Sequence, residues 1–252
     1  FGATGGQPTH PLLLDHLAND FMADGWSLKK LVRRLVLTRA YQLASLPSED
    51  ANWQAAHAAD PENKLLWRAH RRRLDAHALR DAMLTLSGTL DATFLGPNVQ
   101  ADSVDANSGG AQNLEYDYIF ADTRRSLYAP AFRNKRLEIF EAFDYADING
   151  PIGQRTRSTI APQALYFLNH PFVIEQSQAA AARLLSDEAL PTPEARLNHL
   201  WLATLGRKPS AADLQHALAF TAPSSSADTS PQDLHAHLIQ TLLATADFRF
   251  LD

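Results

Sequence analysis

Several polar residues near the middle of the chain could together bind an anion. Guanidinium groups are planar donors that suit carboxylate, sulfate or phosphate, and a helix beginning near Pro162 would add its positive end. The same residues could instead form a buried polar network that ties an irregular segment to the helices, and we favour this interpretation. The residues of this cluster are Arg155, Arg157, Thr159, Gln163 and Asn169.

Acidic residues just before this cluster could supply the carboxylates of a glycoside hydrolase. Such an enzyme needs one carboxylic acid to protonate the leaving oxygen, and one carboxylate to attack or to activate water. Asp144, Asp147 and Glu141 have this chemistry, although a sequence does not give their separation. Because Gly150 and Pro151 follow closely, the same acids are also typical of ordinary turns.

A third group of ionisable residues is spaced three, four and four positions apart, so one face of a helix could display all of them. Two of them, His77 and Asp81, could bind a divalent metal with a third ligand from another segment. An arginine on that face would repel a cation, however, and an ion-pair ladder that also includes Arg71, Arg72 and Asp75 explains the same pattern. We therefore expect no metal here. The group consists of His70, Arg73, His77 and Asp81.

The pair Gly5-Gly6 lies shortly before a predicted helix and could offer backbone N–H groups to an anion. It lacks the Gly-Lys-Ser/Thr ending of a phosphate loop and the spacing of a dinucleotide fingerprint, so a tight turn is the better explanation. His10 adjoins this loop, and a histidine can act as an acid, a base or a ligand at neutral pH. As a lone histidine beside Pro11, it is expected to cap or to pack.

Oxygen ligands in a loop suit calcium in principle, and Asp102, Asp105 and Asn107 are such residues. Their spacing misses the calcium-loop template, so we favour a solvated loop. The surrounding run is rich in turn-forming residues, and a mobile insertion is expected over about residues 96–113. A second segment, residues 223–230, is expected to be a flexible connector because Ser, Asp and Thr dominate it.

The composition of the chain excludes several classes of protein. Its 252 residues are 45% hydrophobic, which is enough to bury a core. The 23 Lys and Arg against 28 Asp and Glu give a net charge of −5, which opposes binding to nucleic acid or to an anionic membrane. The absence of Cys excludes disulfides, thiolate metal sites and a covalent c-type haem within these residues. No run approaches the ~20 apolar residues that a membrane span needs.

Helix starts are marked by a polar residue followed by proline, because proline suits the first helical position. These pairs are His10-Pro11, Asp60-Pro61, Thr192-Pro193 and Ser230-Pro231. Apolar residues at helical spacing predict helices over residues 11–24, 28–35, 65–90, 162–168, 171–185, 197–205, 210–218 and 231–248.

In the second of these helices, Leu28, Leu31, Val32 and Leu35 are expected to form a buried stripe, with the basic residues between them on a solvated face. Helical periodicity gives way to loops over residues 93–135, where residues 125–129 alternate like a short edge strand. The predicted fold class is therefore mainly α. We expect a single multi-helix domain with an irregular, loop-rich middle and at most a small β element.

Several ordered phrases of the sequence resemble one family. They are residues 1–11 (FGATGGQPTHP), 25–29 (GWSLK), 72–81 (RRLDAHALRD), 124–128 (RRSLY), 143–144 (FD), 159–165 (TIAPQAL) with 168–169 (LN), and 205–209 (LGRKP). Together they cover nearly the whole chain. The chain is similar to a planctomycete-type C-terminal domain of unknown function that follows cytochrome-c-like planctomycete modules in longer polypeptides.

The resemblance implies a setting and no activity, because that family has none established. It implies that this chain is part of a longer extracytoplasmic protein, periplasmic or secreted, with a link to polysaccharide use. A haem would belong to a separate upstream module, and no cofactor is expected within this chain. One departure is that residues 135–137 (KRL) stand where many members place a segment with proline, which puts any role of that loop in doubt.

Two functions follow from these patterns and from the resemblance. We expect a non-catalytic helical module that docks against neighbouring upstream domains of the same polypeptide, because no catalytic motif is recognised. The alternative is an enzyme that acts on polysaccharide, including sulfated forms, through Asp144 or Asp147 with His10 or His77. The arginine cluster with Arg155 and Arg157 would then hold the anionic group, and Arg125 of the resembling phrase is a further candidate for a ligand or a polar network.

Overall fold

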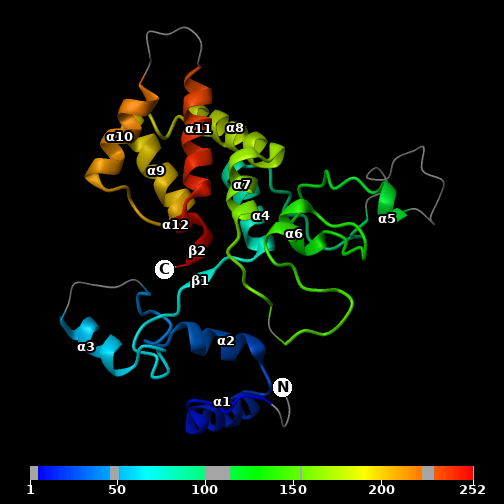
Figure 1. Cartoon of the computed structure of the whole chain (residues 1–252), viewed down its shortest axis with the longest axis vertical. Helices are drawn as coiled ribbons and strands as arrows, with labels where there is room; N and C mark the ends of the chain where they lie inside the picture. The colour runs from blue at the N-terminus through cyan, green and yellow to red at the C-terminus, as the bar shows by residue number, and fades with distance from the viewer. Residues whose placement is uncertain (1–4, 46–50, 100–113, 154, 223–229, 252) are drawn as a thin grey trace. The chain divides into compact units, whose positions relative to one another are not determined.

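The computed structural model describes residues 5–45, 51–99, 114–153, 155–222 and 230–251. Within these residues, twelve α-helices make up most of the regular structure, with one 3-10 helix and one two-stranded sheet (Figure 1). The predicted mainly α fold class is confirmed. Most of the insertion expected over residues 96–113, including Asp102, Asp105 and Asn107, and nearly all of the connector expected over 223–230 lie outside the described residues.

Contacts between residues divide the chain into two compact units. Unit 1 consists of residues 1–72 and 250–252, and unit 2 of residues 73–249. The chain passes between them at the strands β1 (Arg72–Arg73) and β2 (Phe250–Leu251), which pair in the sheet. The expectation that both units belong to a single domain stays a prediction.

Unit 1 begins with the two helices α1 (Pro11–Ala23) and α2 (Leu28–Val36). Pro11 occupies the first turn of α1, as predicted. Ser27 caps α2, because its side-chain oxygen accepts the backbone N–H of Lys30 at 3.4 Å. The two helices contact each other, and Arg34 donates to Asp24 at 3.0 Å across the contact. Both predicted helix starts are confirmed.

The prediction that Leu28, Leu31, Val32 and Leu35 form a buried stripe is wrong. Neither α1 nor α2 contains a buried residue, and the side chain of Leu28 is 69% exposed. Helical spacing places these apolar residues on one face of α2. The short helix α1 does not cover that face. The apolar face of α2 therefore lies open.

The predicted helix start at Asp60-Pro61 is also wrong, because Asp60 follows the end of a helix, α3 (Ala51–Ala59). The Asp60 carboxylate accepts the backbone N–H groups of Lys64 at 2.9 Å and Leu65 at 2.7 Å. The Asn63 side chain likewise donates to the Arg68 carbonyl at 2.7 Å. These bonds hold a turn in which Leu66 has a positive φ of 56°, a conformation that cannot continue a helix.

The longest predicted helix, over residues 65–90, covers the end of the first stretch of unit 1 and the start of unit 2. The helix α4 covers only Ala76–Ser87, because Asp75 caps its N-terminus by accepting the Ala78 N–H at 2.9 Å. Gly88 ends it in the left-handed conformation, with φ 79°. The prediction that His70 and Arg73 share a helical face with His77 and Asp81 is therefore wrong, since both precede α4.

The irregular middle of unit 2 contains three short elements. They are α5 (Leu114–Asp117), the 3-10 helix η4 (Ser126–Tyr128) and α6 (Glu138–Ala142). The edge strand predicted over residues 125–129 is wrong. Instead, the Asp81 carboxylate of α4 accepts the Ser126 N–H at 2.7 Å, which fixes this segment as a tight turn beside α4.

The remaining helices of unit 2 begin close to the predicted positions. Gly206 ends α9 with φ 68°, and Ser210 with Asp213 forms the predicted capping box. Because caps are local, the sequence alone was sufficient to place these ends. The helices are α7 (Ala161–Asn169), α8 (Pro171–Ser186), α9 (Pro193–Leu205), α10 (Ala211–Thr221), α11 (Pro231–Ala244) and the short α12 (Ala246–Arg249).

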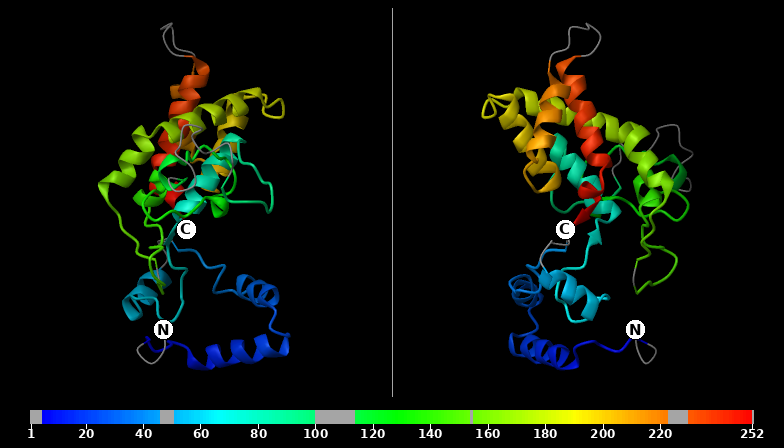
Figure 2. Two further views of the ribbon diagram at one scale, coloured as in Figure 1. Left: turned by 90° about the vertical axis from the view of Figure 1, so that its right-hand side faces the viewer. Right: turned by 60° about the vertical axis from the view of Figure 1, so that its left-hand side comes forward.

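These helices enclose one hydrophobic core in unit 2. The helix α11 packs along α8, which also contacts α4, while α9, α10 and α11 lie side by side (Figures 1 and 2). Each fully buried large aliphatic side chain there contributes about 1.5–3 kcal/mol. The irregular middle supplies part of the core as well, through Tyr118, Ile139, Phe140 and Phe143. From the helices come, among others, Leu79, Met83, Phe167, Val173, Leu197, Ile239 and Leu243.

Among the described residues, no helix combines the length and apolar character that crossing a bilayer requires.

Candidate functional site

The polar residues that the sequence singles out in unit 2 gather around the two ends of the segment between residues 144 and 158. The buried side chain of Arg73, the last residue of β1, donates to the Asp144 carboxylate at 2.6 Å and to the carbonyl of Ser158. Ser158 returns two bonds to the same carboxylate, from its backbone N–H and from its hydroxyl, each at 2.8 Å. Arg73 and Ser158 therefore occupy both oxygens of Asp144.

Gln163, near the start of α7, completes this network. Its side-chain amide donates to the Ala142 carbonyl at 3.0 Å, and to the carbonyl and hydroxyl of Ser158 at 3.3 and 3.2 Å. Asp144 itself has a positive φ of 55°, which an aspartate tolerates better than most residues. The arrangement joins the end of β1, the end of α6, the segment before α7 and α7 itself through polar groups.

The electrostatics of Asp144 favour a permanent carboxylate. Burial alone would raise its pKa, but the hydrogen bonds from Ser158 and Arg73 outweigh that effect and hold the pKa below its ordinary value. A general acid of a glycoside hydrolase needs a raised pKa so that it carries a proton at neutral pH. Asp144 is thus suited to anchor a loop and poorly suited to donate a proton.

Asp147 and Glu141, the other acids of that hypothesis, are exposed. Asp147 accepts the backbone N–H and the side-chain amide of Asn149 at 3.0 and 2.9 Å, and these bonds lower its pKa. This pattern is that of an aspartate closing a turn on its own backbone.

A second cluster lies at the N-terminus of α4. The Arg155 guanidinium is 3.4 Å from both the Asp75 carboxylate and Nδ1 of His77. His77 packs beside the stacked rings of Phe140 and Tyr145, at centroid distances of 4.8 and 5.2 Å. Burial lowers the pKa of His77 and Arg155 lowers it further, against the opposing effect of Asp75. His77 is therefore neutral at pH 7 and can accept the Arg155 N–H through Nδ1.

Asp81, one turn further along α4, fixes the segment around Ser126. One of its oxygens accepts the Ser126 N–H, and the other lies 3.9 Å from Nε of the exposed Arg125. His77 and Asp81 do not converge with a third ligand: in the part of the chain that the structure describes, no group of three or more His, Cys, Asp or Glu side chains could hold a metal ion.

The other predicted site residues do not join these clusters. His10 is the N-cap residue of α1 in unit 1, where its Nδ1 lies 2.9 Å from the Thr9 hydroxyl. Arg157, Thr159 and Asn169 are exposed. The residues of the predicted anion site, from Arg155 to Asn169, therefore do not converge. Arg155 contacts Asp75 and His77 at the start of α4, whereas Gln163 donates to Ala142 and Ser158.

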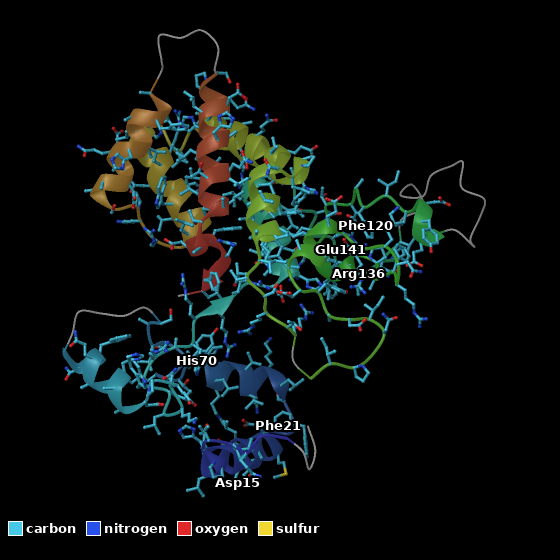
Figure 3. The ribbon with its side chains drawn as sticks, viewed as in Figure 1. Asp15, Phe21, His70, Phe120, Arg136 and Glu141 are labelled. Carbon is cyan, nitrogen blue, oxygen red and sulfur yellow. The ribbon has the colours of Figure 1, made fainter. Side chains whose placement is uncertain are left out.

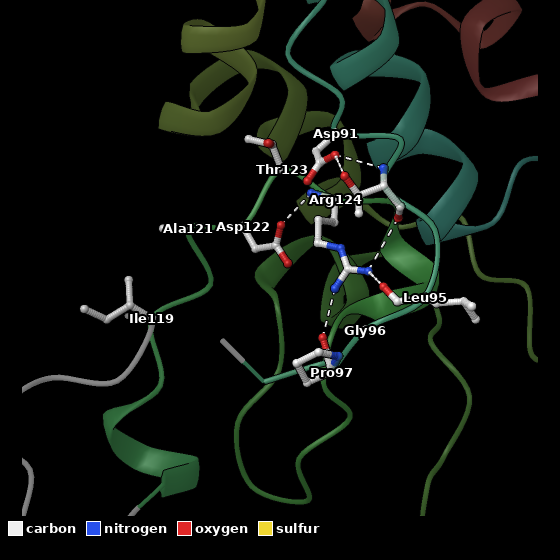
Figure 4. Close-up of a pocket in the computed structure, with 10 residues that line it drawn as sticks. Asp91, Leu95, Gly96, Pro97, Ile119, Ala121, Asp122, Thr123 and Arg124 are labelled. Carbon is white, nitrogen blue, oxygen red and sulfur yellow. Dashed lines mark hydrogen bonds between the residues drawn. The ribbon is translucent and has the colours of Figure 1, made fainter. Parts of the chain in front are cut away.

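Two buried arginines that the sequence analysis did not single out organise the middle of unit 2. Arg124 donates to the carbonyls of Pro97 and Leu95 at 2.9 and 2.5 Å, and its guanidinium lies 4.0 Å from the Tyr128 ring centroid. It lines an open pocket of about 650 Å³ (Figure 4). Since all these partners are neutral, Arg124 acts here as a clamp on the backbone.

The second of these arginines, Arg80, is 5% exposed and projects from α4. It donates to the Arg124 carbonyl at 2.7 Å, to the Ser126 hydroxyl at 3.2 Å and to the Asp122 carbonyl. A signal for it existed in the sequence, because Arg80 falls at helical spacing from Ala76 and Met83 in the apolar stripe of α4. An ionised residue in such a stripe is buried only when it is well bonded.

The fold and these clusters define a mainly helical protein whose ionised residues chiefly bind its own loops. The chain belongs to the family described as PSD1, protein of unknown function (DUF1553), which it matches over residues 1–221. The resemblance to a domain of unknown function is confirmed at this level, and the association with cytochrome-c-like modules stays a prediction. No curated protein and no solved structure matches the chain.

Proposed function

We propose that this chain is a non-catalytic helical module that docks against a neighbouring upstream domain of the same polypeptide through α1 and α2. The observation that carries the proposal is that these two helices bury none of their residues. Large exposed apolar surfaces are uncommon on proteins that act alone, and they mark interaction sites. The apolar residues that the two helices expose include Leu12, Leu13, Leu14, Leu28, Val32 and Leu35, each between 39% and 83% exposed.

The state of the ionised residues supports a module over an enzyme. The alternative, an enzyme acting on polysaccharide or on its sulfated forms, would use Asp144 or Asp147 as an acid. Both have lowered pKa values. Both oxygens of Asp144 and one oxygen of Asp147 already accept hydrogen bonds. Arg73, Asp81 and Gln163, which the sequence also singles out, are likewise engaged with protein groups.

The proposal also includes the setting that the family resemblance implies. The module would belong to an extracytoplasmic protein of planctomycete type, and any haem would be held by an upstream module. Glycan would then be a ligand of the whole protein, with this chain contributing through its contacts to the neighbouring domain.

The test is a binding titration between this chain and the domain that precedes it in the full-length protein. We expect saturable binding, and we expect a Leu28→Ser, Val32→Ser double variant to weaken it about tenfold or more, because apolar anchors dominate such contacts. A matched control is Leu165→Ser with Leu168→Ser, two exposed leucines of α7 in unit 2, which should bind like the unaltered chain. The proposal fails if the unaltered chain does not bind at high micromolar concentration, or if both double variants behave alike.

A further inference from the structure

A cavity of about 500 Å³ in unit 2 is lined by Arg80 and mostly by residues outside the clusters described above. Side chains from α4, α6, α7 and α8 meet there with those of the irregular middle, from which come Phe120 and Arg136, labelled in Figure 3. Its volume is typical of small-molecule sites, which run from about 300 to 1,000 Å³. The polar side chains important for its chemistry are Arg80, Arg136, Glu138, Tyr166, His170 and Gln176.

Arg80 is the buried cation of this cavity, and its hydrogen bonds go to neutral oxygens. Its partners are two backbone carbonyls and the Ser126 hydroxyl. The nearest carboxylate oxygen, on Asp81, is 4.0 Å away and already accepts the Ser126 N–H. Burial lowers the pKa of Arg80, and Asp81 and Asp122 offset only part of that effect. A buried cation without a hydrogen-bonded anion is costly, so an anion that entered the cavity would be stabilised.

Tyr166 adds a hydroxyl donor beside this charge. Burial raises the pKa of Tyr166, and the nearby negative charge of Glu138 raises it further. The phenol therefore keeps its proton throughout the physiological range and can donate it to a ligand. Gln176 offers a donor for a different reason: its carbonyl oxygen accepts from Ser87 and Thr89 at 2.7 and 2.8 Å, which leaves the amide N–H groups.

His170 presents a third donor, and its tautomer follows from its bonds. Nδ1 accepts the Phe172 N–H at 3.1 Å, where His170 caps α8, so in the neutral ring the hydrogen is on Nε2. Nε2 lies 2.5 Å from the carboxylate of Glu138, whose side chain is 71% exposed. A carboxylate held at a solvent-exposed position can exchange with an anionic ligand at little cost.

The rim of the cavity does not oppose an anion. The lining carries Lys135 and Arg136 against Glu138 and Glu175, and Arg80 against Asp122, so its formal charges balance. Charges at an exposed rim are screened by salt within about 8 Å, whereas a buried charge is screened much less. Arg80 is the most deeply buried of these ionised side chains, so it is the charge that salt screens least.

We propose that this cavity binds a small molecule with an oxyanion group, a carboxylate or a phosphate, which Arg80 and the Tyr166 hydroxyl receive together. A guanidinium pairs well with either anion through parallel N–H bonds. The aromatic side chains of Phe120, Tyr166 and Phe172 in the lining leave room for an apolar body on the ligand. This proposal is independent of the docking face, which lies in unit 1.

The experiment is a titration of the full chain with inorganic phosphate and, separately, with benzoate, followed by NMR chemical shifts at constant ionic strength. We expect saturable 1:1 binding of at least one probe, and the probe that binds distinguishes a phosphate-bearing from a carboxylate-bearing ligand. Tyr166→Phe should weaken that binding about tenfold, since a hydrogen bond to a charged group is worth about 1.5 kcal/mol. Tyr145→Phe, which alters a tyrosine outside the cavity, is the matched control and should change nothing.

Arg80→Met should abolish the binding in a variant whose circular dichroism remains helical. If Arg80→Met does not fold, Tyr166→Phe decides the matter on its own. The proposal is overturned if neither probe saturates up to about 50 mM, far above the millimolar range of weak specific binding, or if Tyr166→Phe and Tyr145→Phe bind alike.

Discussion

In each unit, the carboxylate of an aspartate fixes an irregular segment. The sequence separation between the aspartate and its partners differs greatly between the two units. In unit 1, Asp60 binds the backbone N–H groups of Lys64 and Leu65, four and five residues later. In unit 2, Asp144 binds Ser158, 14 residues later, and Arg73, 71 residues earlier. The same chemical group therefore shapes a turn in one unit and ties distant segments together in the other.

The surroundings of the two carboxylates differ as much as their range. The partner of Asp144 is an arginine whose side chain is only 6% exposed, so removing the aspartate would leave a buried charge. The strongest bonds of Asp60 come from backbone N–H groups, which can turn to water if the side chain is lost. The free energy lost with such an aspartate therefore depends mainly on whether its partner stays buried and unpaired or can bind water instead.

The largest effect is expected for Asp144→Ala. It strips the buried Arg73 of its anion and frees Ser158, so the free energy of unfolding should fall by about 3 kcal/mol, at the lower end of measured values for breaking a buried ion pair. Chemical denaturation monitored by circular dichroism measures this. Asp147→Ala, at an exposed turn, is the control and should cost about 0.5 kcal/mol or less. Equal losses for the two variants would contradict the distinction drawn between the two kinds of anchor.

Acid should act on both units in the same direction. Hydrogen bonds from Leu65 and Lys64 lower the pKa of Asp60, and those from Ser158 and Arg73 lower that of Asp144 against the effect of burial. An aspartate with a lowered pKa binds fewer protons in the folded state than in the unfolded state, so it stabilises the fold above its unfolded pKa of about 4. This stabilisation is lost as the pH falls through the folded pKa.

The measurement for this second prediction is the free energy of unfolding at pH 7, 5 and 3, for the unaltered chain and for Asp144→Asn. The asparagine cannot titrate, so the variant should be less stable at pH 7 and should lose less stability between pH 5 and pH 3. A variant whose curve runs parallel to that of the unaltered chain would show that Asp144 does not titrate differently in the two states.

Local signals in the sequence were enough for the helix caps and insufficient for the anchors. Ser27 and Ser210 cap helices through residues three positions later, so a short window contains all the information. The pair Asp60-Pro61 shows the limit of such a window, because a polar residue before proline suits a turn after a helix as well as a helix start. The helix predicted over residues 65–90 forms only over Ala76–Ser87, because Asp75 caps its N-terminus.

The sequence predicted some residues of the polar network around Asp144, but it did not predict which of them pair. Gln163 was expected in a buried network, which the structure shows, whereas nothing near Arg73 in the sequence indicates Asp144 as its partner. Such a pair is created by the packing of α4, α6 and α7. Arg80 could have been found, since a charged residue within an apolar stripe requires buried partners. Tyr166 and His170 could not, because only the fold brings them to one cavity.

The smallest global effect is expected for Asp60→Ala, which sharpens the comparison from the side of unit 1. The turn that follows α3 should loosen, because the N–H groups of Lys64 and Leu65 lose their acceptor. Hydrogen exchange at these two amides should therefore accelerate, while the core amides of α11 in unit 2 keep their protection, since local openings need not involve global unfolding. Asp60→Asn retains an acceptor oxygen and should slow the exchange again. If Asp60→Ala accelerated exchange in α11 as strongly as at Leu65, this aspartate would be a long-range anchor like Asp144, and the contrast between the units would rest on chain separation alone.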